Sequence, residues 1–140
     1  MTQNFVHLVQ ILVMEDFSYD SEHYKLHFKD GIFFGTYIGG PITLGLAKEI
    51  VRKRLELTGG EEVLAIANIE EVNGIDRDAR NYLSSAEGTK GITAGAIITD
   101  SAFTKHLANF FMKIPFSKSL IPGKVFSNEE EAILWLKKFG

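Results

Sequence analysis

The order of apolar and polar segments predicts a single α/β domain with a mixed sheet of roughly four to six strands and about four helices. Residues 22–38 show the period-two alternation of a β-hairpin. The segments 63–69 and 92–99 are nearly continuous apolar runs, typical of buried central strands, and each is followed by a helical pattern. This order favours a helix-covered sheet that is mostly parallel in its second half.

Composition is that of an ordinary globular protein. The chain has 140 residues, of which 45% are hydrophobic and 24% charged, and it includes 11 Phe. A domain of this size buries roughly 70% of the surface that its unfolded chain exposes. The net charge of −3 provides no positive field for a phosphate backbone, so nucleic acid is not an expected partner.

The chain contains no cysteine, which excludes disulfides, thiolate metal sites and a cysteine nucleophile. This fits a reducing compartment, and we expect a cytoplasmic protein. The apolar segment Phe5–Val13 is shorter than the ~20 residues of a membrane span. We interpret it as an extra strand or short helix in an N-terminal extension, residues 1–21, that packs on a domain comprising residues 22–140.

The hairpin is the strongest local prediction. Tyr24, Leu26 and Phe28 alternate with polar residues, Asp30-Gly31 supplies the turn, and the second strand runs from Ile32 to Ile38. This second strand is apolar on both faces, with Phe33 and Tyr37 opposite Ile32 and Phe34. The face away from the core could be covered by the N-terminal extension, by a second copy through the N-terminal segment and hairpin, or by an apolar ligand. We favour an intramolecular cover, with a homodimer as the alternative.

Four helices are expected, each with a capping residue. Thr43 caps a helix to about Leu57 with an apolar stripe of Leu44, Ala47, Val51 and Leu55, and Asp76 caps a helix that ends near Gly88. Asp100 and Ser101 precede an apolar stripe, and Ser127 with Glu130 has the capping-box spacing before a last helix, Ala132–Leu136. The stripe after Ser101 consists of Phe103, Leu107, Phe110, Phe111 and Ile114.

Several short strings in this order resemble a STAS domain, the fold of bacterial anti-sigma-factor antagonists, and more closely its uncharacterised branch grouped with CRAL-TRIO lipid-binding domains. They are Val63–Ile69 leading through Gly74-Ile75-Asp76 into a helix, Asn109-Phe110-Phe111, and Lys124–Leu136. The resemblance covers about residues 22–139. It implies a regulatory protein-interaction domain, with an apolar ligand between the 103–114 helix and the sheet as the alternative.

The anti-sigma-factor antagonists that this chain resembles have the sequence Asp-Ser-Ser-Gly after the central strand. The Ser at the start of the following helix is the one that is phosphorylated. This chain reads Asp76-Arg77-Asp78-Ala79, so that switch residue is replaced. A carboxylate at Asp78 carries one negative charge against about −1.5 to −2 for a phosphate, and is a weak substitute. The candidate partner-binding residues are Asp76, Arg77, Asp78 and Tyr82.

Other polar groups have a structural interpretation beside a functional one. Glu70, Glu71, Asp76 and Asp78 could hold a divalent cation or form an acid–base pair, although helix capping and solvation explain them more simply. His23 and His27 share a strand face and could form half of a zinc site, while His7 and His106 are isolated.

The sequence Thr99-Asp100-Ser101 lies where open α/β sheets bind ligands, at a strand end and a helix start. Helix capping is again the simpler interpretation, and Asp100 and Ser101 are the candidate ligand or modification residues. The glycines match neither dinucleotide nor Walker spacing, so no nucleotide cofactor is expected. No residue spacing specifies metal geometry, so no metal is expected either. The sequence favours a non-enzymatic domain; a small enzyme using the carboxylates near Asp76 is the least favoured alternative.

Overall fold

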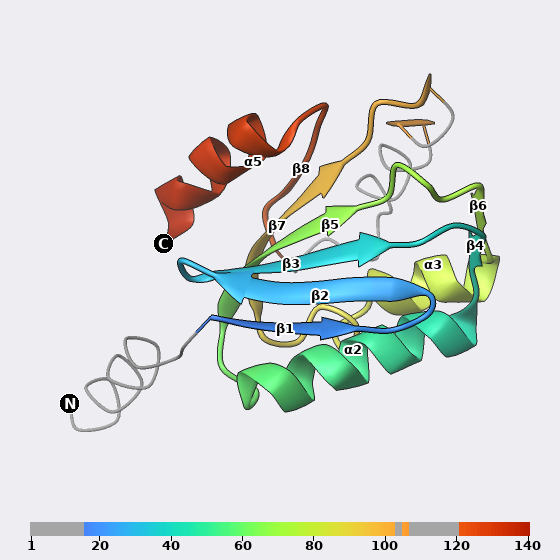
Figure 1. The fold of residues 1–140 in the computed structure, drawn as a ribbon, viewed down its shortest axis with the longest axis horizontal. Coiled ribbons are helices and arrows are strands. Elements are labelled where there is room, and N and C mark those ends of the chain that lie inside the picture. Colours follow the sequence, from blue (N-terminus) through green and yellow to red (C-terminus); the bar gives the residue numbers. More distant parts are fainter. Residues whose placement is uncertain (1–15, 103–104, 107–120) are drawn as a thin grey trace.

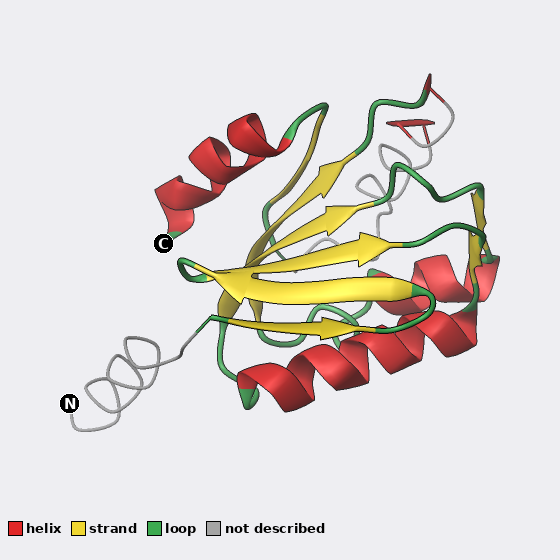
Figure 2. Ribbon diagram, in the orientation of Figure 1, coloured by secondary structure: helices red, strands yellow, loops and turns green. Residues whose placement is uncertain are grey.

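The structure, a computed structural model, describes residues 16–102, 105–106 and 121–140. A six-stranded sheet lies at the centre, with helices α2 (Leu44–Thr58) and α3 (Arg77–Leu83) on one face and α5 (Glu129–Leu136) on the other (Figure 1, Figure 2). This layered arrangement confirms the predicted α/β class. None of the helices in the described part of the chain is long and apolar enough to cross a membrane.

The sheet has the order β1-β2-β3-β5-β7-β8. The first three strands are antiparallel: β1 (Phe17–Asp20), β2 (Tyr24–Lys29) and β3 (Ile32–Tyr37). From β3 onward the pairs are parallel: β5 (Val63–Asn68), β7 (Ile92–Ile98) and β8 (Gly123–Phe126). The predicted mixed sheet, parallel in its second half, is therefore confirmed.

The β2–β3 hairpin forms at the predicted Asp30-Gly31 turn. Both turn residues have positive φ, 53° for Asp30 and 80° for Gly31, as a tight turn between twisted strands requires. Tyr24, Leu26 and Phe28 are buried and Lys25 is exposed, so the predicted alternation is correct. The strand before the hairpin, β1, comes from the expected N-terminal extension; the segment 5–13 lies outside the described residues.

Helix α2 has the predicted cap but a different buried stripe. The Thr43 hydroxyl accepts a hydrogen bond from the Leu46 amide at 3.1 Å, and Gly59 ends the helix with φ 65°. The predicted stripe included Leu44 and Leu55, which are only half-buried. The side chains that α2 buries are Ala47, Ile50, Val51, Arg54 and Thr58.

Helix α3 ends at Leu83, before the predicted limit near Gly88. The Ser84 hydroxyl donates to the Arg80 carbonyl at 3.1 Å, and the Ser85 hydroxyl donates to the Tyr82 carbonyl. Serine hydroxyls that bond to nearby carbonyls in this way compete with further helical hydrogen bonding. The chain then turns through residues 84–91 before β7.

A second, two-stranded sheet was not predicted. It pairs β4 (Pro41–Ile42) with β6 (Gly74–Ile75) in parallel, with Pro41 opposite Gly74. These strands precede α2 and α3, respectively, so the small sheet links the starts of the two helices (Figure 1).

The capping box predicted for the last helix is wrong by one residue. Asn128, not Ser127, is the N-cap of α5, and its side chain accepts from the Glu131 amide at 2.9 Å. The Ser127 hydroxyl instead accepts from the Lys105 ammonium at 3.2 Å. Asn128 is extended with φ −148°, as an N-cap residue requires, and α5 then leads into a short 3-10 helix, Lys137–Phe139.

Two apolar cores lie on opposite faces of the sheet. Phe33 and Tyr37 belong to the core beneath α2 and α3. Ile32 and Phe34 belong to the core that contains Ala132 and Leu136 of α5. The second apolar face of the hairpin is therefore covered within the chain by α5, a cover that the sequence argument did not name.

Candidate functional site

The predicted site residues follow parallel strands at the same edge of the sheet. Strand β5 leads through residues 69–73 to Asp76, and β7 leads directly to Asp100 and Ser101 (Figure 1). The Ile69 amide donates to the Ile98 carbonyl at 3.0 Å, which holds the two strand ends together. This carboxyl edge is where open α/β sheets bind ligands.

The start of α3 is held in place by backbone hydrogen bonds across the small β4–β6 sheet. The Asp76 amide donates to the Ile42 carbonyl at 3.0 Å, and the Asn73 amide donates to the Gly40 carbonyl at 3.3 Å. The turn before β4 needs Gly39 and Gly40, whose φ values are 63° and 64°. The first residues of α3 are therefore presented from an anchored backbone.

The side chains at this start are turned to solvent. Asp76 occupies the predicted N-cap position, but its carboxylate makes no capping hydrogen bond. Asp76, Arg77 and Asp78 are all exposed, and Asp78 lies in the first helical turn, where its charge favours the positive end of the helix. Asp76 is therefore the N-cap by its place in the backbone, and the prediction that its carboxylate caps the helix is wrong.

Tyr82 lies one turn further along α3 and is half-buried against the core. The Lys48 ammonium of α2 lies 5.8 Å from the centroid of its ring. Burial raises the pKa of the Tyr82 hydroxyl, with Glu87 adding to the shift and Arg54 opposing it. The four candidate partner-binding residues lie at the start of α3 and on its second turn, and are called here the α3 surface: Asp76, Arg77, Asp78 and Tyr82.

The proposed metal and acid–base sites gain no support from the geometry. Glu70, Glu71, Asp76 and Asp78 are all exposed, and Glu70 bonds through its amide to the Asn68 side chain at 3.0 Å. Within the described ranges, no group of three or more His, Asp or Glu residues is placed to hold a metal ion.

The two candidate zinc histidines of β2 differ in their surroundings. The His27 ring stacks on Phe34 with centroids 4.3 Å apart and 6° between the planes. His23 is exposed, and its amide donates to the Ser21 hydroxyl at 3.3 Å. Stacking on the Phe34 ring is enough to explain the position of the His27 side chain.

Asp100 is exposed and Ser101 is half-buried at the end of β7. The Ser101 carbonyl accepts from the Lys105 amide at 2.8 Å, which is the spacing of a helical turn. The predicted stripe of Phe103, Leu107, Phe110, Phe111 and Ile114 lies outside the described residues, as does the ligand site predicted beneath it. His7 also lies outside them, and His106 is exposed.

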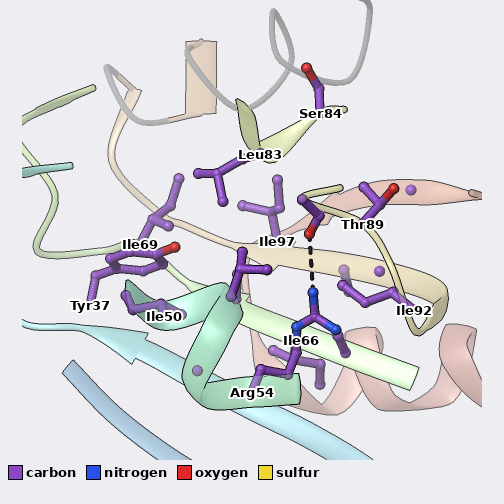
Figure 3. A pocket seen from close by; sticks show the side chains of 18 of the residues that line it. Tyr37, Ile50, Arg54, Ile66, Ile69, Leu83, Ser84, Thr89, Ile92 and Ile97 are labelled. Carbon is purple, nitrogen blue, oxygen red and sulfur yellow. Dashed lines mark hydrogen bonds between the residues drawn. The ribbon is translucent and has the colours of Figure 1, made fainter. Parts of the chain in front are cut away.

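A cavity that sequence reasoning missed lies between the sheet and the helices α2 and α3. Its volume is about 260 Å³. Four small residues on neighbouring strands line it and leave room above the sheet: Gly35, Ala65, Ala67 and Gly95. Larger apolar side chains from α2, α3 and the start of β7 line the space, among them Ile50, Leu83 and Ile92 (Figure 3).

Among the described residues that line this apolar cavity, Arg54 is the cation. Arg54 of α2 is only 4% exposed, and Figure 3 shows its guanidinium reaching across the cavity wall toward the turn after α3. Its Nη1 donates to the Lys90 carbonyl at 2.6 Å and its Nη2 to the Gly88 carbonyl at 3.1 Å. Burial lowers the pKa of Arg54 to about 10, with smaller opposing effects of Tyr37 and Tyr82.

Tyr37 of β3 lines the same cavity and is 7% exposed. Burial raises the pKa of its hydroxyl to about 12, and the nearby Arg54 charge opposes that shift. The other polar side chains in the described lining are Ser84 and Thr89, whose hydroxyls donate to the carbonyls of Arg80 and Ser85. Arg54 and Tyr37 are therefore the polar groups that a molecule in this cavity would meet.

A comparison with protein families gives a match over residues 26–140 to a family described as a domain of unknown function, DUF7793. The chain belongs to this family. No curated protein sequence matches it.

Two solved structures share the fold of this DUF7793 chain. One is an uncharacterised protein of the DUF3478 family with a SpoIIAA-like fold from Shewanella loihica PV-4, at a TM-score of 0.54 and 16% identity over 87% of this chain and 92% of that one. The other is the anti-sigma factor antagonist SpoIIAA in its unphosphorylated form, at a TM-score of 0.52 and 16% identity over 81% of this chain and 97% of that one. The resemblance to the STAS fold is confirmed at the level of fold.

Sequence reasoning had one signal for the buried cation of this DUF7793 chain. Arg54 falls three residues after Val51 and four after Ile50, on the buried stripe of α2. A charged residue at such a position is rarely fully buried without partners. The partners are carbonyls of the distant residues Gly88 and Lys90, which no local pattern connects to Arg54.

Proposed function

We propose that this chain is a non-enzymatic, regulatory protein-interaction domain that binds its partner through the α3 surface. The observation that carries this proposal is the set of consecutive exposed charges at Asp76, Arg77 and Asp78, presented from the β4–β6 anchor. Charged side chains on a fixed backbone favour specific, electrostatically steered protein contacts.

The fold supports the regulatory part of the proposal. SpoIIAA, which has the same fold, is an anti-sigma factor antagonist, and its structure is described as the unphosphorylated form. Fold alone does not determine function, so the residues of the α3 surface must carry the argument for this chain.

The composition of α3 favours regulation that does not use phosphorylation at its start. From Asp76 to Leu83 the chain contains neither Ser nor Thr. A partner that contacts this surface would meet fixed charges of both signs from Asp76, Arg77 and Asp78. Binding would then be controlled by the abundance of the partner or by a second ligand.

The exposed carboxylates also support a non-enzymatic role. An enzyme that used Glu70, Glu71, Asp76 and Asp78 would need them in a polar cleft that excludes water. All four are exposed, and the cavity of this chain is lined by other residues.

The test is affinity capture with the full chain and paired charge reversals. Arg77→Glu changes the α3 surface. Lys29→Glu makes the same change on an exposed residue that pairs with Ile32 at the start of β3, the end of the sheet opposite to the strand ends that lead to α3. A partner captured by the unmodified chain and by Lys29→Glu, but lost by Arg77→Glu, would support the proposal. Equal capture by all three would show that the α3 surface is not the contact.

A second copy of the chain is the alternative partner, through the N-terminal segment and the hairpin. β1 is the outermost described strand next to the hairpin, and an unpaired strand edge is a template for pairing with another chain. Sedimentation equilibrium over a range of concentrations tests this directly. A monomer at all concentrations would exclude the second copy and leave a different protein as the partner.

A further inference from the structure

The cavity between the sheet and the helices α2 and α3 combines an apolar lining with one buried cation. Its floor is open because Gly35, Ala65, Ala67 and Gly95 place little or no side chain there. A mostly apolar lining offers water few polar partners, which favours an apolar molecule in this space.

The charge of Arg54 has no carboxylate partner among the described residues. Over residues 16–102, 105–106 and 121–140, no carboxylate lies within ion-pair distance of Arg54, and the surrounding groups that affect its charge are Tyr37 and Tyr82. The sequence from residue 103 to 120 contains no Asp or Glu. The carbonyls of Gly88 and Lys90 solvate the guanidinium, but they leave its full positive charge in place.

The guanidinium also retains donor capacity. An arginine has five N–H donors, and the two carbonyls of the 84–91 turn are the described acceptors. Tyr37 belongs to the same lining, and its hydroxyl points toward the same space (Figure 3). A carboxylate in the cavity would therefore find a cation and a hydroxyl group in the same lining.

We propose that this cavity binds a small apolar carboxylate, with its carboxylate at Arg54 and Tyr37 and its hydrocarbon part over Gly35, Ala65, Ala67 and Gly95. The apolar walls exclude a strongly hydrated anion such as inorganic phosphate, because burying it would remove its water without supplying enough donors. An uncharged hydrocarbon would fill the space but leave the Arg54 charge unbalanced. The ligand must supply both parts.

The volume limits the size of the ligand. An engineered apolar cavity of about 150 Å³ holds benzene, which has six heavy atoms. In proportion, the 260 Å³ here holds a molecule of on the order of ten heavy atoms. Octanoate has this size and both required parts, which makes it a suitable probe.

The experiment compares octanoate, 1-octanol and acetate by isothermal titration calorimetry with the full chain. We expect octanoate to bind with a dissociation constant below about 1 mM, 1-octanol to bind at least about tenfold more weakly, and acetate to give no measurable heat. Equal affinity for octanoate and octanol would overturn the role of Arg54. Absence of octanoate binding would overturn the whole proposal.

Two variants locate the site. Ala67→Leu fills the floor without touching Arg54 and should weaken octanoate binding by about tenfold or more, since the lost space cannot be recovered in a packed core. Arg54→Met should lower the affinity for octanoate to that for 1-octanol. Arg52→Met, on the exposed side of the same helix, should leave the affinities for both ligands unchanged. Unchanged octanoate binding by a folded Ala67→Leu protein would place the ligand elsewhere.

This inference is independent of the α3 surface. Arg77→Glu should keep the octanoate affinity of the unmodified chain, because Arg77 is exposed and is not among the cavity residues. Loss of partner capture with intact octanoate binding, or the reverse, would therefore separate the two proposals.

Discussion

Nη2 of Arg54 donates to the Gly88 carbonyl at 3.1 Å, and this buried hydrogen bond connects α2 with the turn that follows α3. A second bond from Nη1 reaches the Lys90 carbonyl at 2.6 Å. Together they bring two segments far apart in sequence into one wall of the cavity. The position of the turn after α3 therefore depends on one side chain of α2.

Arg54→Met should destabilise the fold by about 1–3 kcal/mol. The substitution relieves a buried charge, but it leaves the Gly88 and Lys90 carbonyls without their donors, and each buried orphan acceptor costs about 1–3 kcal/mol. Urea denaturation followed by circular dichroism measures the change. Arg52→Met is the matched control on the same helix, since Arg52 is 66% exposed and pairs with exposed Glu56 at 3.7 Å. Equal losses in the two variants would show that the carbonyl contacts contribute nothing.

Asn128→Ala should cost about 1 kcal/mol, because the Asn128 side chain is the acceptor for the Glu131 amide at the start of α5. Ser127→Ala removes only an exposed contact with Lys105 and should change the unfolding free energy by less than about 0.5 kcal/mol. Chemical denaturation of the two variants side by side makes the comparison. A larger loss of unfolding free energy for Ser127→Ala than for Asn128→Ala would show that Ser127, as the sequence predicted, is the N-cap.

Gly31→Ala should destabilise the hairpin by about 1 kcal/mol. Gly31 has φ 80°, and a Cβ there would meet no atom within 4 Å, so the cost comes from the backbone conformation alone.

Gly45→Ala is the opposite case. Gly45 lies in the first turn of α2 with open space around it, and alanine there should stabilise by a few tenths of a kcal/mol to about 1 kcal/mol. The denaturant midpoint should fall for Gly31→Ala and rise for Gly45→Ala. A stabilising Gly31→Ala would contradict the turn geometry.

The elements that the sequence predicted well are those with a local physical signal. The β2–β3 hairpin follows from alternation plus Asp30-Gly31, and both turn residues adopt the positive φ that such a turn needs. The parallel central strands follow from short apolar runs between turn residues, because a strand covered on both faces has no polar side.

The elements that the sequence missed depend on contacts between distant residues. Each strand of the β4–β6 sheet has only two residues, which is too short for a repeating pattern of polar and apolar residues. Pro41 pairs with Gly74, which is distant in the sequence. The same holds for Arg54, whose acceptors come from the turn after α3. The cap of α5 was displaced by one residue because Ser127 and Asn128 are both good N-cap residues, and backbone geometry decides between them.

Alkaline pH should reduce stability through Tyr37. Burial raises the pKa of its hydroxyl from 10.0 to about 12, so the folded chain keeps a proton that the unfolded chain releases. This contribution is fully present below about pH 10 and is lost as the pH rises toward 12; two pKa units correspond to on the order of 2–3 kcal/mol. Arg54 acts in the opposite direction, because burial lowers its pKa to about 10 and the folded chain releases that proton first.

Comparing Tyr37→Phe with the unmodified chain isolates the contribution of the Tyr37 hydroxyl. Urea denaturation between about pH 8 and pH 11 should show a smaller fall in unfolding free energy for Tyr37→Phe, and parallel pH profiles for the two proteins would show that the Tyr37 hydroxyl is not buried.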